Sequence, residues 1–289
     1  AEANYLAIQQ VLEAGDEIIV EKPGWPQAEV LAKACGATIK PVFRRETEAW
    51  ALPLDDFRAA VSDKTKLIFL TNPNNPTGRL LTFEELKEIT NIAQSVGAWL
   101  IVDEVYAGLE WHSPRAPSIA ALYERGITTG SVSKALGLQG LRTGWMICRD
   151  ETLIMDAVIL RENSSEIMNI MGEVLAEIAL RPDRYQTAMD KAREEGRANL
   201  NILSTFIEKQ PSLSWIPPQA GLIGLARLLG DHDGDFVAKT LLAAPYRTFL
   251  LPGSAYEQPN HIRLGVGGGK EANLALGLSR LKKLLDRFN

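Results

Sequence analysis

The chain has 289 residues, of which 46% are hydrophobic and 23% are charged, and its formal net charge is −5. This composition is typical of a globular protein with a sizeable core, and the charge offers no basic surface for nucleic acid. The longest apolar runs, such as residues 67–70, are far too short to span a membrane. Cys35 and Cys148 lie far apart in apolar surroundings, which is typical of reduced thiols in a cytoplasmic protein.

The first residues already form a helical pattern. The chain begins at Ala1 rather than at a methionine, and it enters this helix at once. We therefore expect that the natural N-terminus lies upstream of Ala1.

Helix and strand signals alternate along the first two thirds of the chain. Thr82 and Glu85 have the spacing of a capping box at the start of one helix. Short apolar strands separated by helices predict a parallel α/β sheet that is covered on both faces. Ligands of such sheets bind beyond the carboxyl ends of the strands. The predicted helices are residues 2–13, 26–35, 54–61 and 82–96, and the predicted strands are residues 17–20, 38–42, 67–70 and 99–102.

The last third has a different organisation. Residues 151–180 have a helical pattern that Arg181 and Pro182 interrupt, and a long helix is predicted from Asp183 to about Lys209. Strand, helix, strand and a last helix at 271–288 follow. We therefore predict a large domain over residues 1–182 and, over residues 183–289, a linking helix with a small α+β domain.

Polar segments follow two of the buried strands. The strand at 67–70 leads into the turn-rich segment 71–78, Thr-Asn-Pro-Asn-Asn-Pro-Thr-Gly. Its composition fits an ordinary loop and a ligand-binding loop about equally well. The strand at 99–102 leads into Asp-Glu-Val-Tyr at 103–106, where the first carboxylate could cap a helix or face a ligand.

A third segment contains a lysine between serines and glycines. It runs Ser-Val-Ser-Lys at residues 131–134 and is followed by Gly137, Gly140 and Arg142. A single lysine is usually solvated, so this segment alone would indicate a surface position for Lys134. The three polar segments nevertheless occur in order after three strand-like runs, which favours a common site.

Together the segments resemble the fold type I, pyridoxal phosphate (PLP)-dependent aminotransferases of class I/II, the aspartate aminotransferase-like superfamily. The resemblance covers the whole chain. It rests on Asn-Pro-Thr-Gly at 75–78, Asp-Glu-Val-Tyr at 103–106, and Ser-x-Ser-Lys with Arg142 eight residues after Lys134. Each motif is weak alone, and their family-like separations make the combination specific. The resemblance implies a three-layer, mostly parallel large domain and a smaller α+β C-terminal domain.

The resemblance also implies the residues around the cofactor ring. Lys134 would hold PLP as a Schiff base and then move the substrate's α-proton. Asp103 would keep the pyridine nitrogen protonated. Tyr106 and Asn75 would hydrogen-bond the 3-oxygen, and Asn75 would also reach the substrate carboxylate. Trp25 would stack on the ring, although a packing role after a turn is the alternative.

The phosphate and the substrate carboxylate each have implied partners. Ser131 and Arg142 would hold the phosphate, and Ser133 could add a contact. Backbone amides of Ala1 and Glu2, at the start of the first helix, would contribute as well. The implied carboxylate partner is Arg263, which lies in an apolar, strand-like run and could instead form a structural salt bridge.

The sequence departs from the family pattern at its start. Family members carry an N-terminal arm, part of the small domain and a tyrosine that reaches the neighbouring subunit's phosphate before the position of Ala1. None of these is visible, so the chain resembles a member without its N-terminal segment. Residues 218–224, near the substrate in the family, carry no charge and leave the substrate side chain open.

The main functional hypothesis is a homodimeric aminotransferase that moves an amino group from an amino acid to a 2-oxo acid by a ping-pong mechanism. A PLP-dependent lyase, cyclase or decarboxylase on the same fold is the second hypothesis, because a fold does not fix the bond that breaks. A non-catalytic PLP-binding module is the third. The expected partners are small molecules, with neither nucleic acid nor membrane, and no metal site is predicted.

Overall fold

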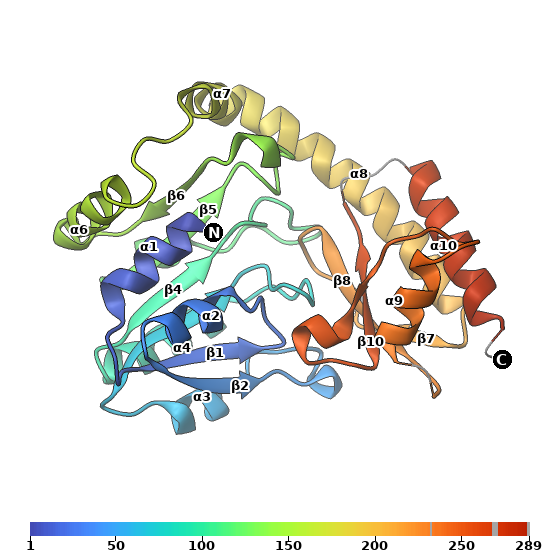
Figure 1. Cartoon of the computed structure of the whole chain (residues 1–289), viewed down its shortest axis with the longest axis horizontal. Helices are drawn as coiled ribbons and strands as arrows, with labels where there is room; N and C mark the ends of the chain where they lie inside the picture. The colour runs from blue at the N-terminus through green and yellow to red at the C-terminus, as the bar shows by residue number, and fades with distance from the viewer. Residues whose placement is uncertain (232, 268–270, 288–289) are drawn as a thin grey trace.

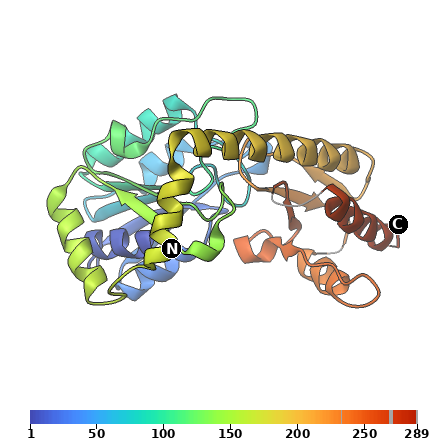
Figure 2. The same cartoon turned by 90° about the horizontal axis from the view of Figure 1, so that it is seen from above.

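The computed structural model describes residues 1–231, 233–267 and 271–287. Figure 1 shows two sheets side by side, with the long helix α8 (Pro182–Glu208) running from the side of the larger sheet to that of the smaller one. Figure 2 shows the same helix lying along one side of the molecule between the two parts. None of the described helices is both long and apolar enough to cross a membrane.

The larger sheet has six strands in the order β2-β1-β3-β4-β5-β6. Neighbouring strands are parallel except β6, which runs antiparallel to β5. The predicted mostly parallel α/β sheet is therefore confirmed. The strands are β1 (Glu17–Lys22), β2 (Thr38–Phe43), β3 (Thr65–Thr71), β4 (Trp99–Asp103), β5 (Gly126–Ser131) and β6 (Gly144–Ile147).

Helices cover both faces of this sheet because alternate strand residues point to opposite sides. Ile18 and Val20 of β1 pack in one cluster with α1, α2 and α6. Ile19, between them, packs in a second cluster with α3, α4 and α5. The covering helices are α1 (Glu2–Val11), α2 (Gln27–Ala34), α3 (Leu54–Ala60), α4 (Phe83–Ser95), α5 (Ile119–Leu122) and α6 (Glu151–Glu162). The next helix, α7 (Ile170–Leu180), packs on α8 instead.

The capping box at the start of α4 is present as predicted. The Glu85 amide donates to Thr82 Oγ1 over 3.0 Å, and the Thr82 amide donates to Glu85 Oε2 over 2.7 Å. These bonds satisfy two amides that an uncapped helix leaves without partners.

The helical stretch predicted over residues 151–180 is divided into α6 and α7. Asn163 and Ser164 follow α6, and their side chains donate to the carbonyls of Ile159 and Leu160 over 2.8 Å each. Short polar side chains that bond the backbone in this way compete with a continuing helix. The sequence pattern missed this break because the apolar periodicity resumes at Ile170.

The smaller sheet is antiparallel and has the order β7-β8-β10-β9. Its core is shared with α8, α9 and α10. The predicted strand–helix–strand–helix pattern is present, with two further short strands. The elements are β7 (Leu213–Trp215), β8 (Ile223–Leu228), α9 (Gly234–Leu242), β9 (Leu251–Pro252), the 3-10 helix η3 (Gly253–Tyr256), β10 (His261–Gly265) and α10 (Glu271–Leu285). The final residues of the helix predicted at 271–288 include Phe288, which lies outside the described residues.

Candidate active site

A cavity of about 690 Å³ lies beyond the carboxyl ends of the central strands. Strand register places Thr71 and Asp103, the last residues of β3 and β4, beside Thr129, which lies two residues before the end of β5. All eleven residues that the sequence analysis placed in the site line this cavity: Ala1, Glu2, Trp25, Asn75, Asp103, Tyr106, Ser131, Ser133, Lys134, Arg142 and Arg263.

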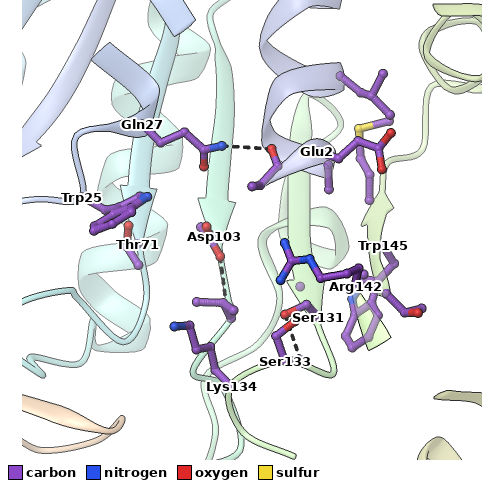
Figure 3. Close-up of a pocket in the computed structure, with 18 of the residues that line it drawn as sticks. Glu2, Trp25, Gln27, Thr71, Asp103, Ser131, Ser133, Lys134, Arg142 and Trp145 are labelled. Atoms are coloured by element: carbon purple, nitrogen blue, oxygen red, sulfur yellow. Dashed lines mark hydrogen bonds between the residues drawn. The ribbon is translucent and has the colours of Figure 1, made fainter. Parts of the chain in front are cut away.

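Lys134 lies on a tight turn after β5. Val132 fixes the turn, because it is fully buried and its carbonyl accepts from the Leu138 amide over 3.1 Å. Gly137 closes the turn with a φ of +68°, which favours glycine. Figure 3 shows the Lys134 amine directed toward the space beyond Asp103. Within the described part of the chain, this amine has no hydrogen bond or ion pair, so it is available to react.

Asp103 stands at the end of β4. Its Oδ2 accepts from Asn4 Nδ2 over 2.8 Å, and its Oδ1 accepts from the Val105 amide over 3.0 Å. Burial raises the pKa of the Asp103 carboxyl, and the bonds from Asn4 and Val105 oppose that effect without cancelling it. A cation beside this carboxylate would restore its charge.

Asn4 of α1 was missed by the sequence analysis. Thr129 Oγ1 donates to Asn4 Oδ1 over 2.6 Å, so the amide nitrogen must face Asp103. Asn4 is 2% exposed and sits on the face of α1 that buries Ala7 and Ile8. An asparagine on an apolar helix face needs partners, and this was the available signal.

The loop after β3 holds Asn75 rigidly. Asn74 Oδ1 accepts from both the amide and the hydroxyl of Thr77, over 3.1 and 2.6 Å. Gly78 has a φ of +69°, and a Cβ there would lie 2.9 Å from the Ala220 carbonyl oxygen. The same glycine accepts from the amides of Gln219 and Ala220, which docks this loop on the segment before β8.

Arg263 reaches the cavity from β10 of the smaller sheet. Its Nη1 donates to the Tyr256 hydroxyl over 2.5 Å and to Asn75 Oδ1 over 3.3 Å. Among the residues that the structure describes, Arg263 forms no ion pair, which argues against the alternative of a structural salt bridge. The guanidinium therefore keeps its charge for a ligand.

Tyr106 is buried beside Arg263. Burial raises the pKa of Tyr106 to about 12, although the positive charge of Arg263 opposes the rise. The hydroxyl consequently stays protonated at neutral pH and can donate a hydrogen bond into the cavity.

Polar groups gather at the other end of the cavity. Ser131 Oγ accepts from the Ser133 amide over 3.2 Å, and Arg142 Nη1 donates to the Gln139 carbonyl over 3.3 Å. Arg142 has a φ of +57°, which is a strained value for an arginine. Strained backbone conformations of this kind are common at functional sites. Ala1 and Glu2 lie at the N-terminus of α1, where helix amides attract anions.

Trp25 flanks the cavity on the side opposite Arg142 (Figure 3). The residue is 47% exposed, which is unusual for a tryptophan that serves only to pack a core. This exposure favours a role in which the indole ring of Trp25 stacks on a planar ligand. No group of three His, Cys, Asp or Glu side chains suited to a metal occurs in the described ranges.

Comparison with known proteins assigns the chain to one family. The profile of the family described as aminotransferase class I and II matches residues 1–281. An aspartate aminotransferase of Musicola paradisiaca is 28% identical, over 94% of this chain and 69% of that protein. A capreomycidine synthase of Streptomyces vinaceus is 27% identical, over 92% of this chain and 67% of that protein.

A solved structure gives the same result for the fold. A PLP-dependent aminotransferase of Streptococcus suis superposes with a TM-score of 0.93 at 29% identity, covering 99% of this chain and 75% of that one. The chain therefore spans about two thirds to three quarters of the length of these proteins.

Proposed function

Because the chain belongs to the class I and II aminotransferases, which are PLP-dependent enzymes of fold type I, we propose that it transfers an amino group from an amino acid to a 2-oxo acid by a ping-pong mechanism. The strongest support is the placement of Lys134, Asp103 and Arg142 around one cavity. These side chains supply an amine, a carboxylate and a cation, which match the aldehyde, the pyridine nitrogen and the phosphate of PLP.

The chemistry of the cavity fits this cofactor. Asp103 is a carboxylate whose burial raises its pKa while its protein donors, Asn4 and Val105, are neutral. A protonated pyridine nitrogen is the kind of partner that such a carboxylate lacks. When bound, PLP supplies an electron sink for the negative charge that develops at the substrate's α-carbon.

Lys134 has two proposed tasks. Its amine, unpartnered within the described residues, anchors the cofactor covalently. The same amine would also move the proton away from the substrate's α-carbon. Asp103, whose carboxylate accepts from Asn4 and from the Val105 amide, would keep the pyridine nitrogen of the bound cofactor protonated.

The remaining residues orient the bound molecules. Ser131 and Arg142 hold the phosphate, with Ser133 and the amides of Ala1 and Glu2 beside them. Tyr106 donates to the 3-oxygen, and Asn75 serves both that oxygen and the substrate. Trp25 covers the ring, and Arg263 receives the substrate carboxylate.

The cofactor roles are tested by absorbance. We expect the purified protein, after incubation with PLP, to show the visible band of lysine-bound cofactor, and we expect Lys134→Ala to lose it. Lys283→Ala, an exposed lysine of α10, should keep the band. A wild-type protein without the band would contradict the assignment of Lys134.

The reaction is tested by single half-reactions. The loaded protein is mixed with each amino acid of a panel without any 2-oxo acid. Ping-pong transfer predicts one equivalent of 2-oxo acid and conversion of the cofactor to its amine form. Release of ammonia or carbon dioxide, or a cyclised product, would instead support the second hypothesis, a PLP-dependent lyase, cyclase or decarboxylase. The similarity to a capreomycidine synthase is the reason to test it.

We also propose that the enzyme is a cytoplasmic homodimer. Two-fold dimers are the commonest assembly of enzymes, and the family resemblance supports this state. Sedimentation of the purified chain should give twice the monomer mass of 31.8 kDa.

A further inference from the structure

A buried tyrosine stands behind the arginine that reaches the cavity. We propose that Tyr256 is a positioning residue for carboxylate recognition, whose hydroxyl fixes the guanidinium of Arg263 in the orientation that receives the substrate. This role rests on the carboxylate-binding role proposed for Arg263.

Tyr256 contacts Arg263 in two ways. Its hydroxyl accepts from Arg263 Nη1 over 2.5 Å, and the centre of its ring lies 5.6 Å from Arg263 Cζ. Tyr256 is 2% exposed and does not line the cavity, so it acts on a ligand through Arg263. A side chain with so little exposure has little freedom to move, and it therefore provides a fixed support.

The contacts divide the guanidinium into a held part and an available part. Nη1 is occupied by Tyr256 and by Asn75 Oδ1. In the described chain, Nε and Nη2 of Arg263 have no protein acceptor. A carboxylate is captured best by two parallel N–H groups, and a guanidinium that is already oriented loses less freedom on binding.

The hydroxyl orients the guanidinium without neutralising it. Burial raises the pKa of Tyr256, and the effects of Arg263 and Asn75 only partly oppose the rise, so the phenol stays uncharged at neutral pH. An aspartate or glutamate in this place would orient Arg263 equally well. It would, however, form an ion pair and compete with the substrate carboxylate for the positive charge.

An ion pair of the next residue links this segment to the larger sheet. The next residue, Glu257, accepts from Lys22 Nζ at the end of β1 over 2.6 Å. Lys22 is buried and also pairs with Glu29 of α2. The support of Arg263 is thereby connected to the larger sheet at the strand that leads to Trp25.

Tyr256→Phe isolates the hydroxyl, because it keeps the ring and its contact with the guanidinium. Tyr246→Phe is a matched control. Tyr246 is also a buried tyrosine beside the smaller sheet, and its hydroxyl accepts from Arg287 Nη1 over 3.2 Å, away from the cavity. Arg263→Ala is the reference for complete loss of the carboxylate contact.

Binding and kinetics are measured for each protein loaded with PLP. The probes are succinate, an unreactive carboxylate, and succinamide, its uncharged analogue, titrated by calorimetry. The kinetic measure is kcat/KM for the best amino acid of the panel divided by kcat/KM for its amide. Thermal melting reports whether each variant is folded.

We expect Tyr256→Phe to weaken succinate binding about tenfold and to lower the acid-to-amide ratio by a similar factor, as for loss of one charge-assisted hydrogen bond. Succinamide binding and the melting behaviour should match those of Tyr246→Phe. Unchanged succinate binding and ratio in Tyr256→Phe, with both lost in Arg263→Ala, would overturn the role of Tyr256 alone. An unchanged ratio in Arg263→Ala would overturn the carboxylate role of Arg263 itself.

Discussion

The two sides of the cavity are built differently. On the larger sheet, Asp103 ends β4 and Lys134 lies in the turn after the adjacent strand β5, and the parallel register of the two strands fixes their ends. On the smaller sheet, Arg263 enters from a single strand and depends on Tyr256 for its orientation. The comparison suggests that cofactor chemistry rests on a rigid sheet, whereas substrate recognition rests on a few side chains that join two sheets.

The largest effect is expected from Asp103→Asn. The amide cannot hold the pyridine nitrogen protonated, so we expect kcat to fall by roughly two to three orders of magnitude, as when a preorganised charge is removed from a site. Steady-state kinetics with excess PLP measures the loss.

Glu104→Gln is the control for that prediction. Glu104 is the adjacent carboxylate, is 8% exposed, and pairs with Arg115 rather than lining the cavity. We expect it to cost stability and leave kcat largely intact. Equal losses of kcat in the two variants would contradict the specific role of Asp103 in the site.

Asn4→Leu should have a smaller effect of the same kind. Leucine has a similar size but cannot donate to Asp103, so the carboxylate loses one of its two orienting bonds. We expect kcat to fall about tenfold and the cofactor absorbance to shift, since one hydrogen bond to a charged group is worth about 1.5–3 kcal/mol. Gln9→Leu on the same helix, with its amide on Cys35, is the control. Unaltered absorbance in Asn4→Leu would show that the sheet alone holds Asp103.

The raised pKa of Asp103 gives a test by stability. Below the ordinary carboxyl range, the folded and unfolded chains both carry a protonated Asp103. As pH rises from there, the unfolded chain ionises first, so the stabilising contribution of the group is lost as pH passes through the raised folded pKa. A tenfold difference between the ionisation constants of the folded and unfolded chains corresponds to about 1.4 kcal/mol of stability.

Urea unfolding of cofactor-free protein measures whether stability falls as pH rises, as expected for Asp103. We expect wild-type protein to lose stability relative to Asp103→Asn as pH rises through the window above the ordinary carboxyl pKa. Added PLP should reverse the trend, because a cation beside Asp103 favours its charged form. A difference that is constant across pH would mean that burial does not control this carboxylate.

The difference between the two sides of the cavity also determines which site residues could be predicted from the sequence. The polar segments that contain Asp103 and Lys134 were singled out because they follow strand-like runs, whose ends meet at one edge of a parallel sheet, but the two residues were assigned to the site through the family resemblance. Arg263 was predicted from the family pattern around it. Asn4 and Tyr256 were missed, since their roles depend on which distant side chain each one meets: Asn4 contacts a residue 99 positions away.

Fold prediction has the same limit. Periodicity located the first four helices and the first four strands to within a few residues, because each is a regular apolar pattern, whereas α5, β5 and β6 were given no range. The division of α6 from α7 and the two-residue strand β9 were not anticipated. They are set by side-chain bonds to the backbone and by pairing with β10, which leave no periodic signal.

The smallest predicted effect concerns the link between the two sheets. Burial lowers the pKa of Lys22, but its bonds to Glu257 and Glu29 outweigh this effect and leave the pKa raised. Glu257→Gln removes one of the two carboxylates, and because the Glu257 side chain is 59% exposed, we expect a loss of less than about 1 kcal/mol of stability. We also expect a two- to threefold rise in KM for the amino acid with kcat unchanged, on the order of 0.5 kcal/mol.

Glu208→Gln, at the exposed end of α8, is the control and should change neither the stability nor KM. If Glu257→Gln lowered kcat and left KM unaltered, the small-sheet contacts would serve the chemistry as well as recognition, and the division between the two sides of the cavity would fail.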